Sequence, residues 1–297
     1  MTVSSPGAKL RRIVAAGTIQ VPGVPNALVG RLAERMGFEA MYLSGAALSA
    51  GVLALPDVGL FTLTELVQQT TYLTRASSLP LIVDADTGFG EAVNVERTIL
   101  ELEHAGAAAI QLEDQQLPKK CGHLSGKTLV EAEVMCAKLR AASASRQDAN
   151  LVIIARTDAR CVTDLDDAIE RAHRYLDAGA DWIFPEAMRS VDEFKRFADA
   201  IDAPLVANMT EFGQSPLLHV KELAEMGYAA VLYPVTMLRV ALKAIEAGLA
   251  MIQNDGWQQE LLDIMQTRDE LYDLLGYEDF DQRDQAYFSS NGDTDLE

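Results

Sequence analysis

Short runs of apolar and β-branched residues alternate with longer amphipathic runs between residues 13 and 253 of the 297-residue chain. The short runs have the length of buried strands, and the longer runs repeat their apolar positions with the helical period. The alternation gives eight strand-helix rounds. The predicted strands are 14–19, 40–44, 81–84, 109–113, 151–156, 182–184, 205–208 and 229–233. The predicted helices are 25–36, 62–77, 93–105, 130–145, 165–178, 190–200, 216–226 and 236–253.

A weak internal repeat marks four of the helix ends. In each, a glycine is followed within a few residues by an apolar run, at Gly37, Gly106, Gly179 and Gly227. Glycine is the usual residue where a helix ends in left-handed backbone. Strands separated by whole helices pair in parallel, and eight such units favour a closed (β/α)8 barrel. The alternative is an open doubly wound sheet, although no glycine-rich phosphate turn follows the first predicted strand.

We predict a single domain over residues 1–297, with the barrel at about 13–253 and a helical extension at about 254–297. The stretch 257–275 predicts at least one helix with an apolar face. The acidic stretch from Glu278 predicts a solvated tail or a segment that wraps a partner.

The formal net charge of −19 disfavours nucleic acid and anionic membranes as partners, because no basic stripe offsets it. Cys121, Cys136 and Cys161 have neither paired spacing nor a CxxC unit, which argues against disulfides and thiolate metal sites. The N-terminus has no apolar signal segment, and the apolar stretch 46–55 is too short to span a bilayer. We therefore expect a cytoplasmic protein.

Carboxylates follow the third and fourth predicted strands. Asp84 and Asp86 are two residues apart at the end of the third strand, so their side chains project to the same side. Asp57 lies in a loop before this strand, and Glu113 ends the next strand. Because oxygen ligands suit hard cations, these carboxylates predict a site for Mg2+ or Mn2+. The alternative is that Asp84 caps a loop and Asp86 begins a turn before Gly88.

The loop after the fourth strand contains the sequence KKCGH at 119–123. Cys121 lies close to Lys119 and His123 in the chain, and cationic neighbours favour the thiolate over the thiol. Gly122 allows the backbone to bend. We predict a catalytic loop on the same face as the carboxylates, because βα loops form the active sites of such barrels. The alternatives are an incidental surface thiol and a solvated histidine.

Other strand ends offer groups that suit an anionic substrate. Arg156 ends the apolar run LVIIAR, where a buried charge is unfavourable unless it binds a partner. Its guanidinium can bind a carboxylate through two parallel hydrogen bonds. Arg239 and Arg268 are further candidates, although a single arginine is more often part of a surface ion pair. A carboxylate also suits the hydroxyl, amide and backbone groups of Ser44, Gly45, Ala46, Asn208, Met209 and Thr210.

Ten short motifs follow one another along the chain. They are YLSG, LPD, VDADTGFG, LEDQ, KKCGH, ARTDA, FPEA, NMTEFG, LYPV and MQTRDELY, beginning at residues 42, 55, 83, 112, 119, 155, 184, 208, 232 and 265. In this order and spacing they resemble the 2-methylisocitrate lyases, a family of the isocitrate lyase and phosphoenolpyruvate mutase superfamily. The resemblance covers nearly the whole chain.

The resemblance implies a carbon–carbon lyase that cleaves 2-methylisocitrate to pyruvate and succinate in propionate catabolism by the methylcitrate cycle. It implies Mg2+, with Mn2+ as the other possibility, at Asp84 and Asp86, and contact of Asp57 and Glu113 with the ion through water. It also implies a homotetramer whose C-terminal helices are exchanged between neighbouring subunits.

The same resemblance implies roles in proton transfer and substrate binding. Cys121 would protonate the succinate carbanion, and Tyr42 is the candidate base. Lys119 and His123 would tune the pKa of Cys121 and help the loop to close. The residues that line the substrate would be Ser44, Gly45, Ala46, Cys121, Gly122, Arg156, Glu186, Asn208, Met209, Thr210, Arg239 and Arg268.

Several alternatives stay open at this point. The related family commonly has glycines where this chain has Ala46 and Ala47, and an alanine there would be strained by about 1 kcal/mol if the backbone required positive φ. Isocitrate lyases carry bulkier aromatics at the positions of Phe184 and Leu232, and 2,3-dimethylmalate lyase shares the loop cysteine. A non-catalytic barrel that binds a carboxylate ligand is the alternative from another class of protein.

Overall fold

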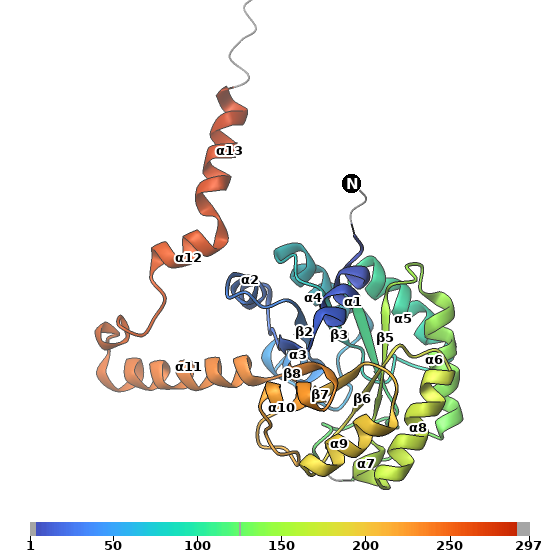
Figure 1. Ribbon diagram of the computed structural model, residues 1–297. Helices are drawn as coiled ribbons and strands as arrows, with labels where there is room; N and C mark the ends of the chain where they lie inside the picture. The colour runs from blue at the N-terminus through green and yellow to red at the C-terminus, as the bar shows by residue number, and fades with distance from the viewer. Residues whose placement is uncertain (1–3, 125, 290–297) are drawn as a thin grey trace, which may run out of the picture. The chain divides into compact units, whose positions relative to one another are not determined.

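A computed structural model describes residues 4–124 and 126–289, and its contacts divide the chain into two compact units, Met1–Arg239 and Val240–Glu297. The first unit contains eight parallel strands surrounded by helices (Figure 1). The strands are β1 (Ile19–Pro22), β2 (Met41–Leu43), β3 (Leu81–Asp84), β4 (Ala109–Glu113), β5 (Val152–Thr157), β6 (Trp182–Pro185), β7 (Leu205–Asn208) and β8 (Tyr228–Tyr233).

The strand order shows a barrel, not an open sheet. From β2 to β8 each strand pairs with the next strand in the chain, and β1 pairs with β8, with Val21 opposite Leu232. Between β1 and β2, Gly23 forms a parallel bridge with Tyr42. The predicted (β/α)8 barrel is therefore confirmed, and the open doubly wound alternative is excluded.

Helices on the outside of the barrel connect successive strands. They are α2 (Ala27–Arg35), α3 (Gly45–Gly51), α4 (Leu63–Ala76), α5 (Ala92–His104), α6 (Ala132–Ser145), α7 (Ala159–Val162), α8 (Leu165–Asp177), α9 (Val191–Ala200) and α10 (Val220–Glu225). Helix α1 (Pro6–Ala16) precedes β1, and α11 (Thr236–Asp255) follows β8. The four glycines of the repeat end α2, α5, α8 and α10 with φ between 85° and 107°. Their left-handed backbone is what the repeat predicted.

The predicted first strand, 14–19, is wrong. Val14 lies in α1, and β1 begins only at Ile19. Ser5 caps α1 by accepting a hydrogen bond from the Ala8 backbone N–H at 3.3 Å, and Pro6 occupies the first helical turn. Leu10, Ile13 and Val14 pack on the barrel interior with helical spacing, so this short apolar run is one face of a helix.

The second unit contains most of α11, a short 3-10 helix at Gln259–Leu261, α12 (Arg268–Leu275) and α13 (Tyr277–Ser289). The tail predicted from Glu278 is thus helical up to residue 289, and its remainder lies outside the described residues. Side-chain hydrogen bonds one turn apart support α13, as from Gln282 to Glu278 at 3.2 Å. Within the described ranges, no helix combines the length and apolarity needed to cross a membrane.

Candidate active site

Charged side chains gather at the carboxyl ends of four neighbouring strands. Asp84 and Glu113 are the last residues of β3 and β4, Arg156 lies near the end of β5, and Glu186 follows β6. Each is at most 7% exposed. Because every strand is parallel, all these side chains reach the same end of the barrel, which is the end where βα loops form active sites.

Three of the carboxylates form an acidic cluster. Asp84, Asp86 and Glu113 each offer one oxygen, and these atoms lie within 4.8 Å of one another. Burial raises the pKa of Asp86 to about 7 and that of Glu113 well above its usual range. Neither oxygen of Glu113 accepts a hydrogen bond. Buried acceptors without donors, next to further carboxylates, fit a hard divalent cation.

Lys119 of the KKCGH loop reaches into this cluster. Its ammonium nitrogen lies 2.7 Å from Asp86 Oδ1 and pairs with Asp57. The side chain is 3% exposed, and although burial opposes the charge, the carboxylates around it raise the pKa of Lys119. Lys119 thus connects the fourth predicted carboxylate, Asp57, to the acidic cluster.

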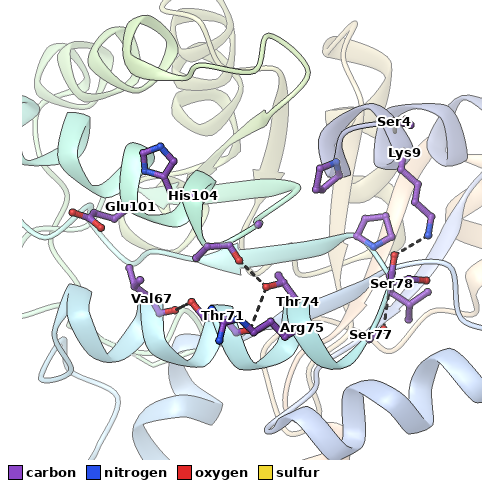
Figure 2. A pocket seen from close by; sticks show the side chains of 15 residues that line it. Ser4, Lys9, Val67, Thr71, Thr74, Arg75, Ser77, Ser78, Glu101 and His104 are labelled. Carbon is purple, nitrogen blue, oxygen red and sulfur yellow. Dashed lines mark hydrogen bonds between the residues drawn. The ribbon is translucent and has the colours of Figure 1, made fainter. Parts of the chain in front are cut away.

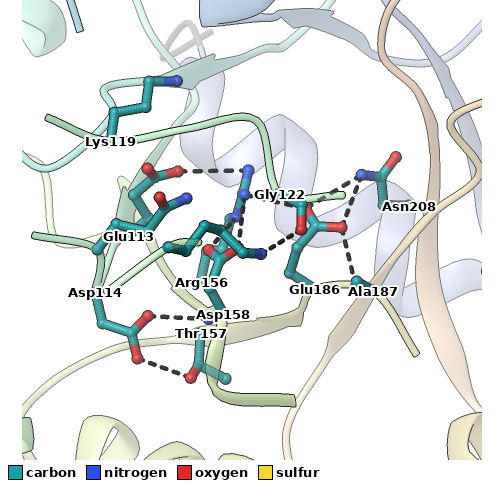
Figure 3. A network of polar contacts seen from close by, with 12 residues as sticks. Glu113, Asp114, Lys119, Gly122, Arg156, Thr157, Asp158, Glu186, Ala187 and Asn208 are labelled. Atoms are coloured by element: carbon teal, nitrogen blue, oxygen red, sulfur yellow. Dashed lines mark hydrogen bonds and ion pairs between the residues drawn. The ribbon is translucent and has the colours of Figure 1, made fainter. Parts of the chain in front are cut away.

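Arg156 lies among three carboxylates rather than one (Figure 3). Its Nε and Nη2 donate to the two oxygens of Asp158 at 3.0 and 3.1 Å, which is the bidentate arrangement. Its Nη1 and Nη2 lie 3.4 Å from Glu113 and 3.3 Å from Glu186. Burial opposes the charge of Arg156, but these carboxylates outweigh it and raise the pKa of its guanidinium.

Glu186 connects Arg156 with the loop and with β7. Its oxygens accept hydrogen bonds from Asn208 Nδ2 at 3.2 Å and from the Ala187 N–H at 2.9 Å (Figure 3). His123 Nε2 lies 2.9 Å from Glu186 Oε1. Burial would raise the pKa of Glu186, yet the charge of Arg156 and the contact with His123 lower it. Glu186 is therefore an ionised anchor for the loop.

Cys121 is predominantly a protonated thiol here, and the expected shift toward thiolate is wrong. Burial raises the pKa of Cys121, and the charges of Glu186 and Asp57 add to that effect. The lowering influence of the His123 backbone N–H and of Arg156 is smaller. Lys119 has its charge matched by carboxylates, so its nearness in sequence does not stabilise a thiolate.

Gly122 packs directly on the charged network. A Cβ atom at this position would lie 2.4 Å from Arg156 Nη2 and 2.6 Å from Glu186 Cγ. On its N-terminal side, Gln115 donates to the Lys120 carbonyl and accepts from the Lys120 N–H, both at 2.9 Å. On its C-terminal side, the Gln214 N–H donates to His123 Nδ1 at 2.8 Å. The loop is held against the barrel end from several sides.

The close approach of Gly122 gives a direct prediction. Gly122→Ala should retain the fold, because the residue lies in a loop at the barrel end, but should lower kcat/KM by about 100-fold, because the loop must move away from Arg156. Steady-state kinetics measure the loss. Gly59→Ala serves as a control on a neighbouring loop: it carries a strained φ of 74° but has only Leu117 and Lys119 side-chain carbons within 3.6 Å. The idea fails if Gly122→Ala retains wild-type kcat/KM.

Tyr42 lies inside the barrel, 2% exposed. Its hydroxyl donates to Gln111 Oε1 at 2.9 Å, and Gln111 Nε2 donates to Asp84 Oδ1 at 3.1 Å. Burial and then the charge of Asp84 raise the pKa of Tyr42 well above its usual value. These contacts make Tyr42 part of the support of the acidic cluster.

The segment 44–47 begins α3 at the edge of the acidic cluster. Ser44 Oγ accepts a hydrogen bond from the Ala47 N–H at 3.4 Å, and the Gly45 N–H donates to Asp84 Oδ2 at 3.1 Å. Ala46 and Ala47 are helical, with φ in the normal negative range, so the expected strain at these alanines is absent. A side chain on Gly45 would approach Asp86 Oδ1 to 3.0 Å.

The remaining predicted substrate residues fall into two groups. Asn208, Met209 and Thr210 are at most 9% exposed, and the Thr210 N–H donates to Asn208 Oδ1 at 3.1 Å. Arg239 pairs instead with Glu211 at 3.1 Å and lies over the ring of Phe212. Arg268 begins α12 in the second unit, where its predicted role stays a prediction.

Sequence reasoning missed three residues that support this end of the barrel. Gln111 and Gln115 belong to or follow β4, and Lys127 follows the loop. Asp158 follows the fifth strand, as the sequence indicates, but its pairing with Arg156 was not predicted. Asp158 stands in the motif ARTDA and Gln115 in LEDQ, so their place among the motifs was an available signal. Lys127 carried no signal, because a lysine in a polar stretch is normally solvated.

Two cavities lie at opposite ends of the barrel. A cavity of about 580 Å3, lined by Lys9, Arg75 and His104 among others, lies beside Leu79 and Pro80, which precede β3 (Figure 2). It is at the opposite end from the carboxylates. A cavity of about 530 Å3 between residues 59–64 and α5 is lined in part by Asp86, and gives the acidic cluster an approach from outside.

A (β/α)8 barrel with an acidic cluster and a loop thiol at the carboxyl ends of its strands defines an enzyme class that works on anionic substrates. Residues 10–253 match the model of the phosphoenolpyruvate phosphomutase family, and the chain belongs to that family.

Relatives with assigned activities narrow the class. A 2-methylisocitrate lyase of Aeropyrum pernix is 56% identical over 280 residues, which cover 94% of this chain and 90% of the relative. The solved structure of a 2,3-dimethylmalate lyase has a TM-score of 0.90 at 31% identity and covers 99% of both chains. A phosphonopyruvate hydrolase, solved with oxalate and Mg2+, has a TM-score of 0.87 at 30% identity, with coverage of 96% and 99%. The predicted family and the predicted lyase class are confirmed.

Proposed function

We propose that the chain cleaves 2-methylisocitrate to pyruvate and succinate. The observation that carries this proposal is the placement of a protonated thiol, Cys121, on a loop whose Lys119 reaches the acidic cluster of Asp84, Asp86 and Glu113. Retro-aldol cleavage needs a group that stabilises oxyanion charge and an acid for the carbanion. The high identity to 2-methylisocitrate lyases over nearly the whole chain supports this particular substrate.

Mg2+ is the proposed cation. Asp84, Asp86 and Glu113 would hold it, with Asp57 close by. The Glu113 oxygens support the fit, because they accept no hydrogen bond and one of them has only the Arg156 guanidinium at 3.4 Å. When bound, the ion supplies positive charge that stabilises negative oxygen in the substrate. The presence of Mg2+ beside oxalate in the related phosphonopyruvate hydrolase supports the choice of metal, and Mn2+ is the other candidate.

The chain's own residues perform binding and proton transfer. Arg156 offers its Nη1 edge, the less occupied side of its guanidinium, to a substrate carboxylate. Asn208 and His123 contact Glu186, which lies 3.3 Å from the Nη2 atom of Arg156, and they supply further polar groups near the guanidinium. The substrate hydroxyl loses its proton to solvent, the Cys121 thiol donates its proton to the succinate carbanion, and the thiolate that remains takes up a proton from solvent. A raised thiol pKa suits this acid, because the proton is present at neutral pH.

Tyr42 is a poor general base in this arrangement. A base must be deprotonated and must accept a proton, whereas burial raises the pKa of Tyr42 and its hydroxyl donates to Gln111. We therefore propose that Tyr42 orients Gln111, and through it Asp84, instead of removing the substrate hydroxyl proton.

A coupled assay for pyruvate tests the function. The purified protein should turn over 2-methylisocitrate with a higher kcat/KM than isocitrate or 2,3-dimethylmalate. One methyl group in an apolar pocket is worth about 1–3 kcal/mol, so isocitrate should be a measurable but poorer substrate. A higher kcat/KM for isocitrate or 2,3-dimethylmalate would contradict the proposed substrate. Ligand-induced stabilisation without product from any of the three would favour the non-catalytic barrel.

Lys119 should compete with the divalent cation. Its ammonium occupies Asp86 Oδ1 and Asp57, so the ion must displace it. Lys119→Met is expected to tighten Mn2+ binding by about tenfold, because one cation no longer neutralises the cluster, while lowering kcat. Titration of free Mn2+ by electron paramagnetic resonance measures the affinity. Lys120→Met is the matched control, since Lys120 contacts the Gly126 carbonyl and not the cluster. Unchanged or weaker Mn2+ binding in Lys119→Met would contradict the competition.

We also propose a cytoplasmic homotetramer built through the second unit. Leu242, Ile245, Leu249 and Ile252 of α11 recur with the spacing of a coiled-coil seam, and each is at least 51% exposed. An apolar stripe of this kind favours burial against another subunit. Light scattering after size exclusion should give four times 32.3 kDa, and Leu242→Lys with Leu249→Lys should shift the mass downward.

A further inference from the structure

Lys127 is a buried lysine beyond the KKCGH loop, and its partners lie on both the loop and the barrel. Its side chain is 1% exposed. The ammonium donates to the carbonyl oxygen of Gly122 and to Asp158 Oδ1, the latter at 2.5 Å. A buried ammonium with one partner on each side joins the two parts.

The barrel side of this connection is rigid. Asp158 is fully buried, receives the two hydrogen bonds from Arg156, and donates its own N–H to Asp114 Oδ1 at 2.9 Å. Asp114 in turn accepts from the hydroxyls of Thr157 and Tyr175 at 2.7 and 2.8 Å. Figure 3 shows Asp158 next to Arg156, and Asp114 joined to Thr157 and Asp158 by dashed lines. Lys127 therefore pairs with a carboxylate, Asp158, whose orientation is fixed by its other hydrogen bonds.

On the loop, the partner of Lys127 is the peptide group between Gly122 and His123, one residue after Cys121. The Gly122 carbonyl sets the orientation of the peptide that links Gly122 to His123, and the Leu124 N–H closes a turn onto the Cys121 carbonyl at 2.9 Å. Gly122 has no side chain of its own with which to hold this position. A donor from outside the loop must fix it, and Lys127 provides that donor.

We propose that Lys127 is a positioning residue for the proton donor: its ammonium holds the Gly122 carbonyl against Asp158 and thereby places the Cys121 thiol over the site. The inference rests on the proposed function for the role of Cys121 as the acid. The simpler role, neutralisation of buried Asp158, would affect stability alone, since Arg156 already pairs with that carboxylate.

The test compares Lys127→Met and Lys127→Gln with Lys9→Met in the full-length protein. Lys9 is the matched control, because its ammonium also donates to a backbone carbonyl, that of Ser78 at 2.8 Å, but is exposed and lies at the opposite end of the barrel. The first readout is the rate at which iodoacetamide alkylates Cys121 without substrate, followed by mass spectrometry of the peptide. Cys136, buried in α6, reports global unfolding in the same sample. The second readout is kcat and KM for 2-methylisocitrate.

Lys127→Met should speed alkylation of Cys121 about tenfold and lower kcat at least tenfold, with KM within threefold, because a misplaced donor affects the chemical step. Loss of a cation alone would raise the thiol pKa and slow alkylation, so a faster reaction reports displacement of the loop. Lys127→Gln should fall between wild type and Lys127→Met, and Lys9→Met should stay within twofold of wild type.

The proposal is overturned if Cys121 alkylation in both Lys127 variants stays within twofold of wild type, or if Cys121 and Cys136 accelerate together with a lower melting temperature. Lys127→Gln decides the matter if Lys127→Met does not fold. Absence of turnover in the wild-type protein would refute the proposed function but leave the alkylation result intact, so the two failures are distinguishable.

Discussion

Cys121→Ser should lower kcat about a thousandfold and leave the fold unchanged. A serine hydroxyl holds its proton far more tightly than a thiol, and the replacement fits the same space between Gly122 and the charged network. Circular dichroism and the melting temperature should match the wild type. Cys136→Ser is the control: its Sγ donates to the Arg174 carbonyl from α6, away from the barrel end, so kcat should change less than twofold.

The pH dependence gives the same role an independent test. Burial raises the pKa of Cys121, so the acid form predominates at neutral pH. If the thiol donates the proton, kcat falls as pH rises through this raised pKa, and the alkaline limb lies above the ordinary thiol range. A thiolate nucleophile would give the opposite slope. Turnover that rises with pH through that range, or wild-type kcat in Cys121→Ser, would remove Cys121 as the proton donor.

Asp86→Asn should weaken Mn2+ binding by about 100-fold or more, and activity should fall with it. Asp86 takes part in the acidic cluster and contacts Lys119, so its charge acts on both cations. Asp114→Asn is the control: Asp114 is also a buried carboxylate, one residue beyond Glu113, but its partners are Thr157, Tyr175 and Asp158. That variant should lose stability yet keep Mn2+ affinity within threefold.

Protons should compete with the metal at Asp86. Burial raises the pKa of Asp86 to about 7, and only the carboxylate binds a cation. Mn2+ affinity of the wild type is therefore expected to decline as pH falls below about 7 and to level off above it. Titrations at pH 6 and pH 8 measure the difference, which should shrink in Asp86→Asn. Equal affinities at both pH values in the wild type would contradict the assignment of Asp86 as a ligand.

The barrel was predictable because its signals are local. Helix ends at Gly37, Gly106, Gly179 and Gly227 need left-handed backbone, and the strands from β2 to β7 are buried on both faces and read as apolar runs, so both signals are short stretches of sequence. The prediction of the first strand was wrong because it used the same kind of local signal. Ile13 and Val14 favour a strand locally, and only their packing beside Leu10 selects the helix.

The acidic cluster was predictable in its membership but not in its partners. Parallel strands bring Asp84 and Glu113 to one end, so their meeting follows from topology. The position of Lys119 in the cluster depends on the fold of its loop, which brings it to Asp57, 62 residues away in the chain. No local sequence pattern encodes such a contact. Sequence nearness gave the wrong sign for the pKa of Cys121 because burial raises that pKa, and because carboxylates from distant segments pair with Lys119.

The sequence by itself determined the barrel, the end of it that carries the site, and the residue types that can hold a cation and supply a proton, because these follow from periodicity and strand topology. The tertiary structure alone decided the protonation of Cys121, the support of Asp84 by Tyr42 and Gln111, and the anchoring of Gly122 by Lys127. Burial and contacts between segments far apart in the chain control these properties, since both change the free energy of a charge more than its sequence neighbours do.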